Sequence, residues 1–345
     1  MDNNKEKQYD VCCVGNWSGF NYGAHLTHYA LYKVLKNEGY KVLMLEKPNV
    51  EPFPPLSKPE LFKENPYTDD ALSKIYDSME DMAELNDICH VFIVGSDQLW
   101  NYELFGHSME FYGLAFVNGD NKKISYGTSL GSVPFPMPDN KKSVMRMLLQ
   151  RFDFVSVRED DGVEFCNEVF GTNAEQVLDP VFLCEPESYV ELIKKSDYSN
   201  DLKMKDPYIF CYIIHPTEEK IEFIRVLSKR RNLQVVCIGD ALRADMDFYG
   251  LERVLEAKVE DWLALLYHSS CVVADSFHAY CFSVIFEKSI FPIYNSRSFS
   301  NRVESVSKVI GAAKPIYLFP YNNRIDDLLN ELEEERLSAS HEKLR

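Results

Sequence analysis

Basic residues are scarce in this 345-residue sequence, which has 37 Lys and Arg against 54 Asp and Glu and a formal charge of −17. A nucleic-acid-binding protein needs a basic face, so the composition excludes a nucleic-acid partner and opposes broad adsorption to an anionic membrane. No apolar run approaches the roughly 20 residues that a membrane-spanning helix needs. The polar start, Met1–Gln8, lacks the apolar segment of a secretory signal. We therefore expect neither a membrane-spanning segment nor a secretory leader.

Metal-binding and dinucleotide-binding patterns are also missing. Nine cysteines are present, but the number is odd, none forms a C-x-x-C pair, and most lie in apolar strand-like runs, at Cys12, Cys13, Cys211, Cys237 and Cys271. Reduced core cysteines of a cytoplasmic protein account for this usage better than a disulfide scaffold or a zinc site. His25 and His28 lie on adjacent helical turns, with no Cys or carboxylate to complete a metal-ligand set. We therefore expect no metal site. Because there is no G-x-G-x-x-G motif either, we also expect no nucleotide cofactor.

What the sequence does contain is typical of a two-domain globular protein. Hydrophobic residues make up 46% and aromatic residues 13%. Apolar runs of β type alternate with helical patterns, which indicates an α/β fold. Strands are predicted over 9–14, 41–45, 90–94, 123–126, 154–157, 175–178, 208–214, 234–238, 271–274, 290–293 and 316–319. Helices are predicted over 25–37, 70–85, 140–151, 218–231, 259–269, 279–287 and 302–310.

A polar, charged stretch at 194–201 interrupts this alternation, which then restarts at Tyr208. We therefore predict two Rossmann-like α/β domains, residues 1–185 and 207–323, that meet across a cleft and are joined by a crossing at 186–206. The charged amphipathic pattern over 324–345 predicts a C-terminal helix.

Three polar residues follow the apolar strand predicted at Cys271–Ala274. Asp275, Ser276 and His278 lie where the carboxyl end of that strand meets a helix N-terminus. Open α/β sheets bind ligands at this edge, and the free N–H groups of a helix N-terminus favour anions. A histidine there is suited to proton transfer beside a bound anion. The structural alternative is that Asp275 caps the helix and His278 is a half-buried residue with satisfied hydrogen bonds.

A second polar segment, Gly95-Ser-Asp-Gln-Leu-Trp-Asn101, follows the strand predicted at 90–94. Hydrogen-bonding groups suited to sugar hydroxyls come from Ser96, Asp97, Gln98 and Asn101, and Trp100 offers an apolar face for a sugar ring. A capped turn is the structural alternative.

Two further positions follow predicted strands. Arg158 ends the strand at 154–157, where a guanidinium can clamp a phosphate or carboxylate or, alternatively, form an ion pair with the acids at 159–161. Asn21 and Tyr22 follow a glycine-bearing turn and are candidates either for lining the cleft or for a structural role.

Several of these motifs together resemble one known family. Val94-Gly-Ser-Asp-Gln-Leu-Trp-Asn101, Ser156-Val-Arg-Glu159, Asp179-Pro180 and Asp275-Ser-Phe-His278 occur in the order seen in polysaccharide pyruvyl transferases, with Asn21-Tyr-Gly-Ala24 and Ser300-Asn-Arg302 fitting the same pattern. The resemblance implies a GT-B-like arrangement of the two domains, acceptor side first and donor side second, with the C-terminal helix returning to the first domain. It also implies transfer of the enolpyruvyl group of phosphoenolpyruvate onto a sugar, leaving a pyruvate ketal and releasing phosphate.

The resemblance also suggests roles for individual residues. Arg158, Ser276 and Arg302 are expected to bind the donor, His278 to act as acid and base, and Asp97 to orient or deprotonate the acceptor. The expected acceptor is a sugar of a surface-polysaccharide precursor, free or lipid-linked, met in the cytoplasm or at the inner face of the membrane. Some members have Arg-Leu-His where this chain has Ser276-Phe-His278, so the phosphate clamp must be completed by Arg302, by Arg297 or by backbone amides after His278.

Two other functions share the predicted architecture. One is a GT-B glycosyltransferase that uses a nucleotide-sugar donor, and the other is a carbohydrate-binding relative that has lost the chemistry. The first would bind nucleoside diphosphates and not phosphoenolpyruvate, whereas the retained His278 and Arg158 speak against the second.

Overall fold

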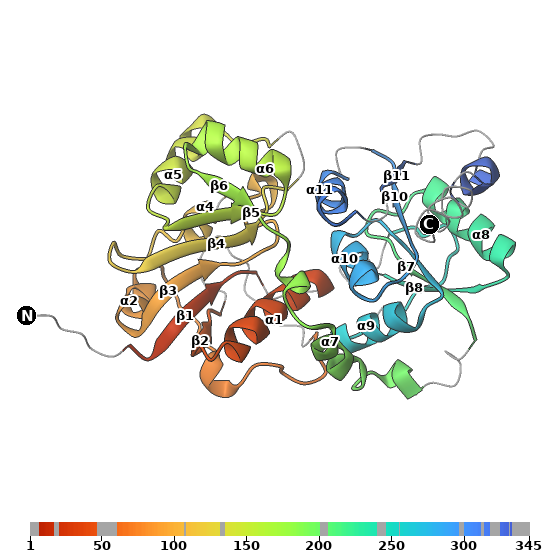
Figure 1. The fold of residues 1–345 in the computed structure, drawn as a ribbon, viewed down its shortest axis with the longest axis horizontal. Coiled ribbons are helices and arrows are strands. Elements are labelled where there is room, and N and C mark those ends of the chain that lie inside the picture. The colour runs from red at the N-terminus through yellow and green to blue at the C-terminus, as the bar shows by residue number, and fades with distance from the viewer. Residues whose placement is uncertain are drawn as a thin grey trace, which may run out of the picture.

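A computed structural model shows two parallel β-sheets, each covered by helices, that lie side by side (Figure 1). The structure describes residues 7–16, 21–46, 61–106, 108–131, 135–200, 206–239, 246–254, 256–296, 300–311, 314–317, 325–330 and 332.

The first sheet has six strands in the order β2-β1-β3-β4-β5-β6, and every pairing is parallel. The strands are β1 (Tyr9–Val14), β2 (Val42–Met44), β3 (Cys89–Val94), β4 (Lys122–Thr128), β5 (Phe154–Val157) and β6 (Ala174–Gln176). Parallel strands are covered by helices on both faces, which is why most of them are apolar runs. The strand order reverses between β1 and β3, and open α/β sheets bind ligands beyond the strand ends at such a switch point.

Helices of the first domain are α1 (Tyr22–Asn37), α2 (Leu85–Ile88), α3 (Tyr102–Phe105), α4 (Met109–Tyr112), α5 (Asp139–Leu149) and α6 (Asp160–Phe165). The helix predicted over 70–85 is wrong, since this stretch holds short 3₁₀ turns at Asp69–Ala71 and Asp81–Glu84 before α2. Tertiary pairing overrides the helical pattern there: Leu72 bridges Met44 of β2, and the Ser73 N–H donates to the Met44 carbonyl at 3.1 Å.

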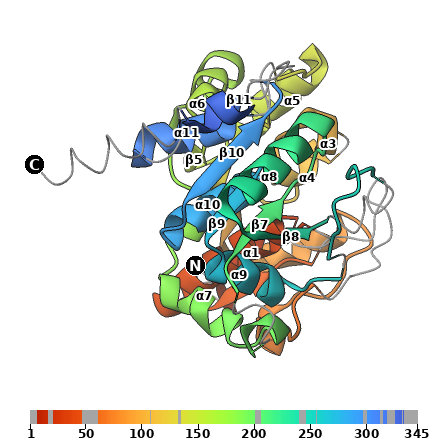
Figure 2. The same cartoon turned by 90° about the vertical axis from the view of Figure 1, so that its right-hand side faces the viewer.

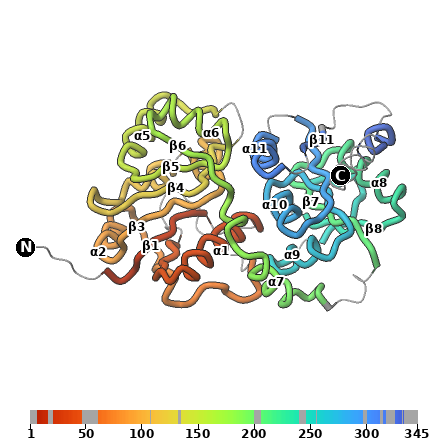
Figure 3. The backbone as a smooth tube through the Cα atoms, viewed as in Figure 1, coloured from red at the N-terminus to blue at the C-terminus, as the bar shows by residue number. Residues whose placement is uncertain are grey.

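The second sheet repeats the same topology with five strands in the order β11-β10-β9-β7-β8. They are β7 (Tyr208–Tyr212), β8 (Gln234–Ile238), β9 (Cys271–Ala274), β10 (Ile290–Tyr294) and β11 (Ile316–Tyr317), with the switch point between β7 and β9. Its helices are α8 (Glu218–Arg231), α9 (Val259–His268), α10 (Phe277–Ile285) and α11 (Asn301–Ile310). A 3₁₀ turn (Pro180–Phe182) and α7 (Pro186–Ile193) lead from the first sheet toward the second (Figure 3).

The two domains share an apolar core at one end of their junction. Tyr22 of α1 stacks on Trp262 of α9 with ring centroids 5.9 Å apart, and its hydroxyl donates to the Ala257 carbonyl at 2.8 Å. Seen from the second domain, α1, α7 and α9 gather at this end, whereas α11 lies beside α6 at the other (Figure 2). The N-terminus of α1 is therefore fixed between both sheets.

The C-terminal segment is described only over 325–330 and 332. Leu329 is buried there in the core of the second sheet, and the Asp326 carbonyl accepts from Arg230 of α8 at 3.3 Å. These residues thus pack on the second domain, and the rest of the predicted helix lies outside the described residues. In the described part of the chain, no helix is long and apolar enough to cross a membrane.

Candidate functional site

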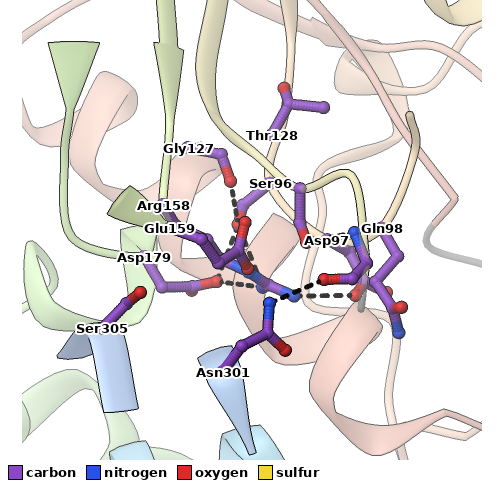
Figure 4. A network of polar contacts seen from close by, with 12 residues as sticks. Ser96, Asp97, Gln98, Gly127, Thr128, Arg158, Glu159, Asp179, Asn301 and Ser305 are labelled. Carbon is purple, nitrogen blue, oxygen red and sulfur yellow. Dashed lines mark hydrogen bonds and ion pairs between the residues drawn. The ribbon is translucent and has the colours of Figure 1, made fainter. Parts of the chain in front are cut away.

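Residues that follow β3, β5 and β9 meet around one buried guanidinium, that of Arg158 at the end of β5. Figure 4 shows it lying between Asp179 and Asp97, with α11 of the second domain approaching through Asn301 and Ser305. Phe277, at the start of α10, places its ring 4.2 Å from the guanidinium carbon. The polar segment after β3 and the start of α10 therefore lie together around Arg158 at the domain junction.

Arg158 is held by three carboxylates. Its Nε donates to Glu159 at 2.9 Å, one Nη donates to Asp179 at 2.8 Å, and the other lies 3.5 Å from Asp97. Burial would lower the pKa of this guanidinium, but Glu159, Asp179 and Asp97 raise it overall. Arg158 therefore forms the ion pair that was the alternative to binding an anion. Its side chain also has no exposed surface.

Asp179 is the most heavily bonded carboxylate of the site and is completely buried. One oxygen accepts from Thr27 of α1 at 2.6 Å, and the other accepts from Ser96 at 2.7 Å and from Arg158. Burial alone would raise its pKa, but His278, Arg158 and Thr27 hold the pKa well below its usual range. Asp179 is therefore a fixed negative charge at neutral pH.

His278 faces that charge from the second domain. It lies on α10, and its Nε2 is 3.6 Å from the Asp179 carboxylate, which is slightly too long for a hydrogen bond. This buried Nε2 has no hydrogen-bond partner among the described residues. Gly23 of α1 fixes the other edge of the ring, because a Cβ at Gly23 would lie only 2.0 Å from Nδ1. The imidazole therefore has a defined direction and an unused nitrogen.

Asp97 sits in a strained backbone conformation. Its φ is +83°, a left-handed value that costs a non-glycine residue free energy and often marks a functional site. Burial would raise the pKa of its carboxyl, but the positive charges of Arg158, His278 and Arg302 lower it overall. Asp97 thus presents an ionised carboxylate, with a side chain 12% exposed, at the carboxyl end of β3.

Arg302 is the second arginine of the site and differs from the first. It lies in the first turn of α11, and its Nε is buried without a hydrogen-bond partner among the described residues. Burial and the neighbouring charge of Arg158 lower the pKa of Arg302. Unlike Arg158, this guanidinium retains a free N–H that can donate a hydrogen bond to an incoming anion.

Several predicted acceptor-binding residues have structural contacts instead. Trp100 is wrong as a platform for a sugar ring, because it is completely buried in the first-domain core and its Nε1 donates to the Tyr112 carbonyl at 3.2 Å. Tyr22 has a structural role and does not line a sugar site, because its ring packs in the apolar core that the two domains share. Asn21 and Asn101 accept from backbone N–H groups at the starts of α1 and α3.

The remaining predicted residues lie close to the network. The Ser96 hydroxyl donates to Asp179, while half-buried Gln98 accepts from the Asn101 amide at 3.0 Å. Ser276 caps α10 through a long 3.4 Å contact with the Ala279 N–H, and Asp275 pairs with buried Lys220 at 2.7 Å. Arg297 lies outside the described residues. Because β3, β5 and α10 converge, the polar groups that follow them form one cluster.

Glu159 is one of the acids expected as ion-pair partners of Arg158. Thr27 and His28 join the cluster without having been predicted, and Asp179 has a central place that its motif had not been given. The signal available for Asp179 was its place before Pro180, where a carboxylate commonly caps a turn. Nothing in the spacing of Thr27 or His28 distinguished them from other helix residues, because their proximity to Asp179 depends on how α1 enters the junction.

Comparisons with known proteins are consistent with this geometry. Residues 21–297 match the family model described as polysaccharide pyruvyl transferase. A comparison with curated protein sequences found no match.

Solved structures with a similar fold come from sugar-nucleotide and cell-wall enzymes. A putative UDP-N-acetylglucosamine 2-epimerase from Listeria monocytogenes has a TM-score of 0.56 at 13% identity, over 96% of this chain and 89% of that one. The Neisseria meningitidis UDP-GlcNAc 2-epimerase has a TM-score of 0.56 at 11% identity, over 94% and 91%. The wall teichoic acid polymerase TagF has a TM-score of 0.51 at 14% identity, over 95% and 82%. At such identities the likeness concerns the fold alone, and it confirms the predicted GT-B-like arrangement.

Proposed function

The chain belongs to the polysaccharide pyruvyl transferase family, and we propose that it transfers the enolpyruvyl group of phosphoenolpyruvate to a sugar and closes a pyruvate ketal. One observation above all supports this proposal: the free Nε2 of His278 lies 3.6 Å from the buried carboxylate of Asp179, and His278 and Arg302, whose Nε is also unpartnered among the described residues, both act as positive charges on Asp97. The acceptor is a sugar of a polysaccharide precursor, free or lipid-linked, that the enzyme meets in the cytoplasm.

Donor binding requires positive charge for a phosphate and a carboxylate. Arg302 supplies a guanidinium with an unused N–H, and the N-terminus of α10 after Ser276 adds backbone N–H groups that favour anions. Arg158 acts differently, by neutralising Asp97, Asp179 and Glu159. Without it, the donor would meet three carboxylates at close range.

The chemistry requires two proton movements. Protonation of the methylene carbon of phosphoenolpyruvate makes C2 electrophilic, and one sugar hydroxyl adds to C2. A second hydroxyl of the same sugar then replaces phosphate at C2 and closes the ketal. Of the two hydroxyl protons, one ends in the new methyl group and the other on the released phosphate, so the atoms balance.

His278 is placed to give the first of these protons. General acid–base catalysis requires a fixed group within hydrogen-bonding reach of the reacting atom. The ring of His278 is fixed by Gly23 on one side, and Asp179 stabilises the imidazolium on the other. Asp97, ionised at the carboxyl end of β3, is proposed to orient the acceptor hydroxyls.

The test measures transfer directly. The purified protein is incubated with phosphoenolpyruvate and a panel of hexose-containing glycans, and products are followed by mass spectrometry and by phosphate release. The proposal predicts a pyruvyl mass gain and stoichiometric phosphate. UDP-sugars serve as control donors: glycosyl transfer from them, without reaction of phosphoenolpyruvate, would identify a glycosyltransferase instead. Binding of glycans without either reaction would indicate the inactive relative.

A further inference from the structure

A second histidine lies at the switch point of the first sheet with one nitrogen unused. His28 is on α1 and only 1% exposed, and its Nδ1 lies 2.7 Å from the Ala24 carbonyl. A carbonyl can only accept, so Nδ1 carries the hydrogen, and Nε2 of the neutral ring presents a lone pair. No described residue donates to this Nε2.

Two glycines place that lone pair at the carboxyl ends of β1 and β3. A Cβ built at Gly15 would lie 1.7 Å from Nε2, and one built at Gly95 would lie 3.2 Å from it. These two strands flank the switch point, where open α/β sheets bind ligands. Leaving a buried acceptor without a donor costs about 1–3 kcal/mol, a cost that is explained if a ligand supplies the donor.

Three charged or titratable groups act on His28 from other elements. They are Asp97 after β3, Asp179 before the 3₁₀ turn, and His278 on α10. Burial lowers the pKa of His28 and favours the neutral ring, while the two carboxylates oppose this and would stabilise the ring once it had accepted a proton. The residue thus starts as a base and has counter-charges for its conjugate acid.

We propose that His28 is the second proton-transfer group of this site, with Nε2 accepting the proton of the acceptor hydroxyl that adds to C2. This inference rests on the proposed function and completes its proton balance. In the first half, protonated His278 gives its proton to the methylene carbon while His28 accepts one from the first hydroxyl, as the O–C2 bond forms.

The second half restores both rings. The bond from C2 to the phosphate oxygen breaks, and His28 returns its proton to the leaving phosphate. The second hydroxyl adds to C2 and gives its proton to His278. Both histidines end in their starting forms, so neither an external acid nor an external base is required.

The first experiment follows the ring nitrogens in the full-length wild-type protein. With ¹⁵N-labelled histidine, NMR should show His28 as the Nδ1–H tautomer. Methyl galacto-, gluco- and mannopyranosides, each with free 4- and 6-hydroxyls, are then added in the presence of inorganic phosphate. We expect at least one sugar to shift the Nε2 resonance of His28 and to leave His25 unchanged. A protonated Nε2, or no shift with any of the three sugars, would overturn the proposal.

The second experiment compares His28→Gln with His25→Gln. His25 is the matched control, a buried histidine on the same helix whose ring packs 5.7 Å from Phe62. His28→Gln should lower kcat about 100-fold, remove one limb of the pH–rate profile and change the KM for phosphoenolpyruvate little, while His25→Gln keeps the profile. A folded His28→Gln enzyme with wild-type kcat and pH profile would refute the role. If the wild type itself releases no phosphate, the proposed function fails, and the NMR result still decides whether His28 meets a sugar.

Discussion

Buried Arg158 and half-buried Arg302 lie close together in this site, and their surroundings give them different roles. Arg158 contacts three carboxylates, whereas Arg302 has a buried Nε without a partner in the described part of the chain. A guanidinium already saturated by carboxylates has little to offer an incoming anion, but its removal would leave buried charges uncompensated. Arg302 should therefore govern donor affinity, and Arg158 should govern stability.

The Arg302→Gln variant should weaken binding of phosphoenolpyruvate by about 10- to 100-fold, because a hydrogen bond to a charged group contributes about 1.5–3 kcal/mol. Its melting temperature should stay close to that of the wild type. Isothermal titration calorimetry measures the affinity. Arg225→Gln, at a half-exposed arginine of α8, is the control and should bind normally. Unchanged affinity in Arg302→Gln would remove Arg302 from the donor site.

The Arg158→Met variant should instead lower the free energy of unfolding by about 3–5 kcal/mol, since it leaves the buried carboxylates of Asp179 and Glu159 without their counter-charge. Urea denaturation measures this loss. A variant as stable as the wild type that fails only in donor binding would restore Arg158 as the direct clamp.

Asp179 should also make stability depend on pH. Its pKa is lowered in the folded state, so its contribution is complete above the unfolded value of about 3.9 and is lost as the pH falls below it. The difference in unfolding free energy between wild type and Asp179→Asn should be constant from pH 7 to 5 and shrink toward pH 3. Urea titrations at each pH test this. A difference that does not change with pH would mean that Asp179 is not ionised in the folded protein.

At the residue scale, the sequence predicted which strand ends carry polar groups. It did not predict which of these groups already have hydrogen-bond partners in the folded protein and which could bind a ligand. Arg158 and Asp97 were expected to serve the donor and the acceptor, but not to contact one another, and the saturation of Arg158 depends on Asp179, which a later turn contributes. Trp100 follows a strand as sugar-binding aromatics can, but its indole turns into the core. Side-chain direction at a turn is set by tertiary packing, which local spacing does not encode.

At the scale of elements, α1 and α10 fix each other through a glycine. Gly23 lies in α1, where alanine would normally favour a helix by about 1 kcal/mol, yet a Cβ would overlap the ring of His278. Gly23→Ala should therefore displace His278 and lower kcat at least tenfold while the helix remains formed. Steady-state kinetics and circular dichroism test this. Gly119→Ala, whose Cβ would meet no atom within 4 Å, should keep full activity.

Most strands and long helices could be predicted from local sequence. The strands are apolar runs, and the helices have an amphipathic pattern that begins or ends at a capping residue. The strands at 9–14, 154–157, 234–238 and 271–274 are confirmed to the residue. The failure over 70–85 has a different origin: an apolar stripe is present, but Leu72 pairs with the edge of the sheet. Only contacts between residues distant in sequence decide whether such a stretch forms a helix or pairs with a sheet edge.

At the scale of the whole molecule, the two ends of the domain junction differ in chemistry. Around Tyr22 and Trp262 the junction is apolar and closely packed. At the other end, polar contacts join α11 to α6: Asn301 donates to Asp161, Ser305 bonds to Asp160, and Lys308 pairs with Asp160. Large apolar interfaces resist domain motion and small polar ones permit it. We therefore expect any opening of the junction to pivot near α1 and to separate α6 from α11.

Asp160 of α6 is the centre of the polar end, which makes it a test of this idea. It accepts from Ser305 at 2.5 Å and pairs with Lys308 at 2.7 Å. The Lys308 pair is exposed and contributes at most about 1 kcal/mol, and the Ser305 bond adds about 1 kcal/mol. Because α11 carries Arg302, Asp160→Ala should weaken phosphoenolpyruvate binding about 5- to 30-fold through lost docking of that helix.

The variant should bind the donor more weakly without losing kcat at saturation, because bound donor restores the docked arrangement. Small-angle scattering should show a larger radius of gyration for free Asp160→Ala, reversed by phosphoenolpyruvate. Lys142→Ala, which removes an ion pair within α5 of the first domain, should change neither quantity. If Asp160→Ala matched the wild type in both affinity and radius of gyration, the apolar end alone would hold the domains together, and Arg302 would be positioned without help from α6.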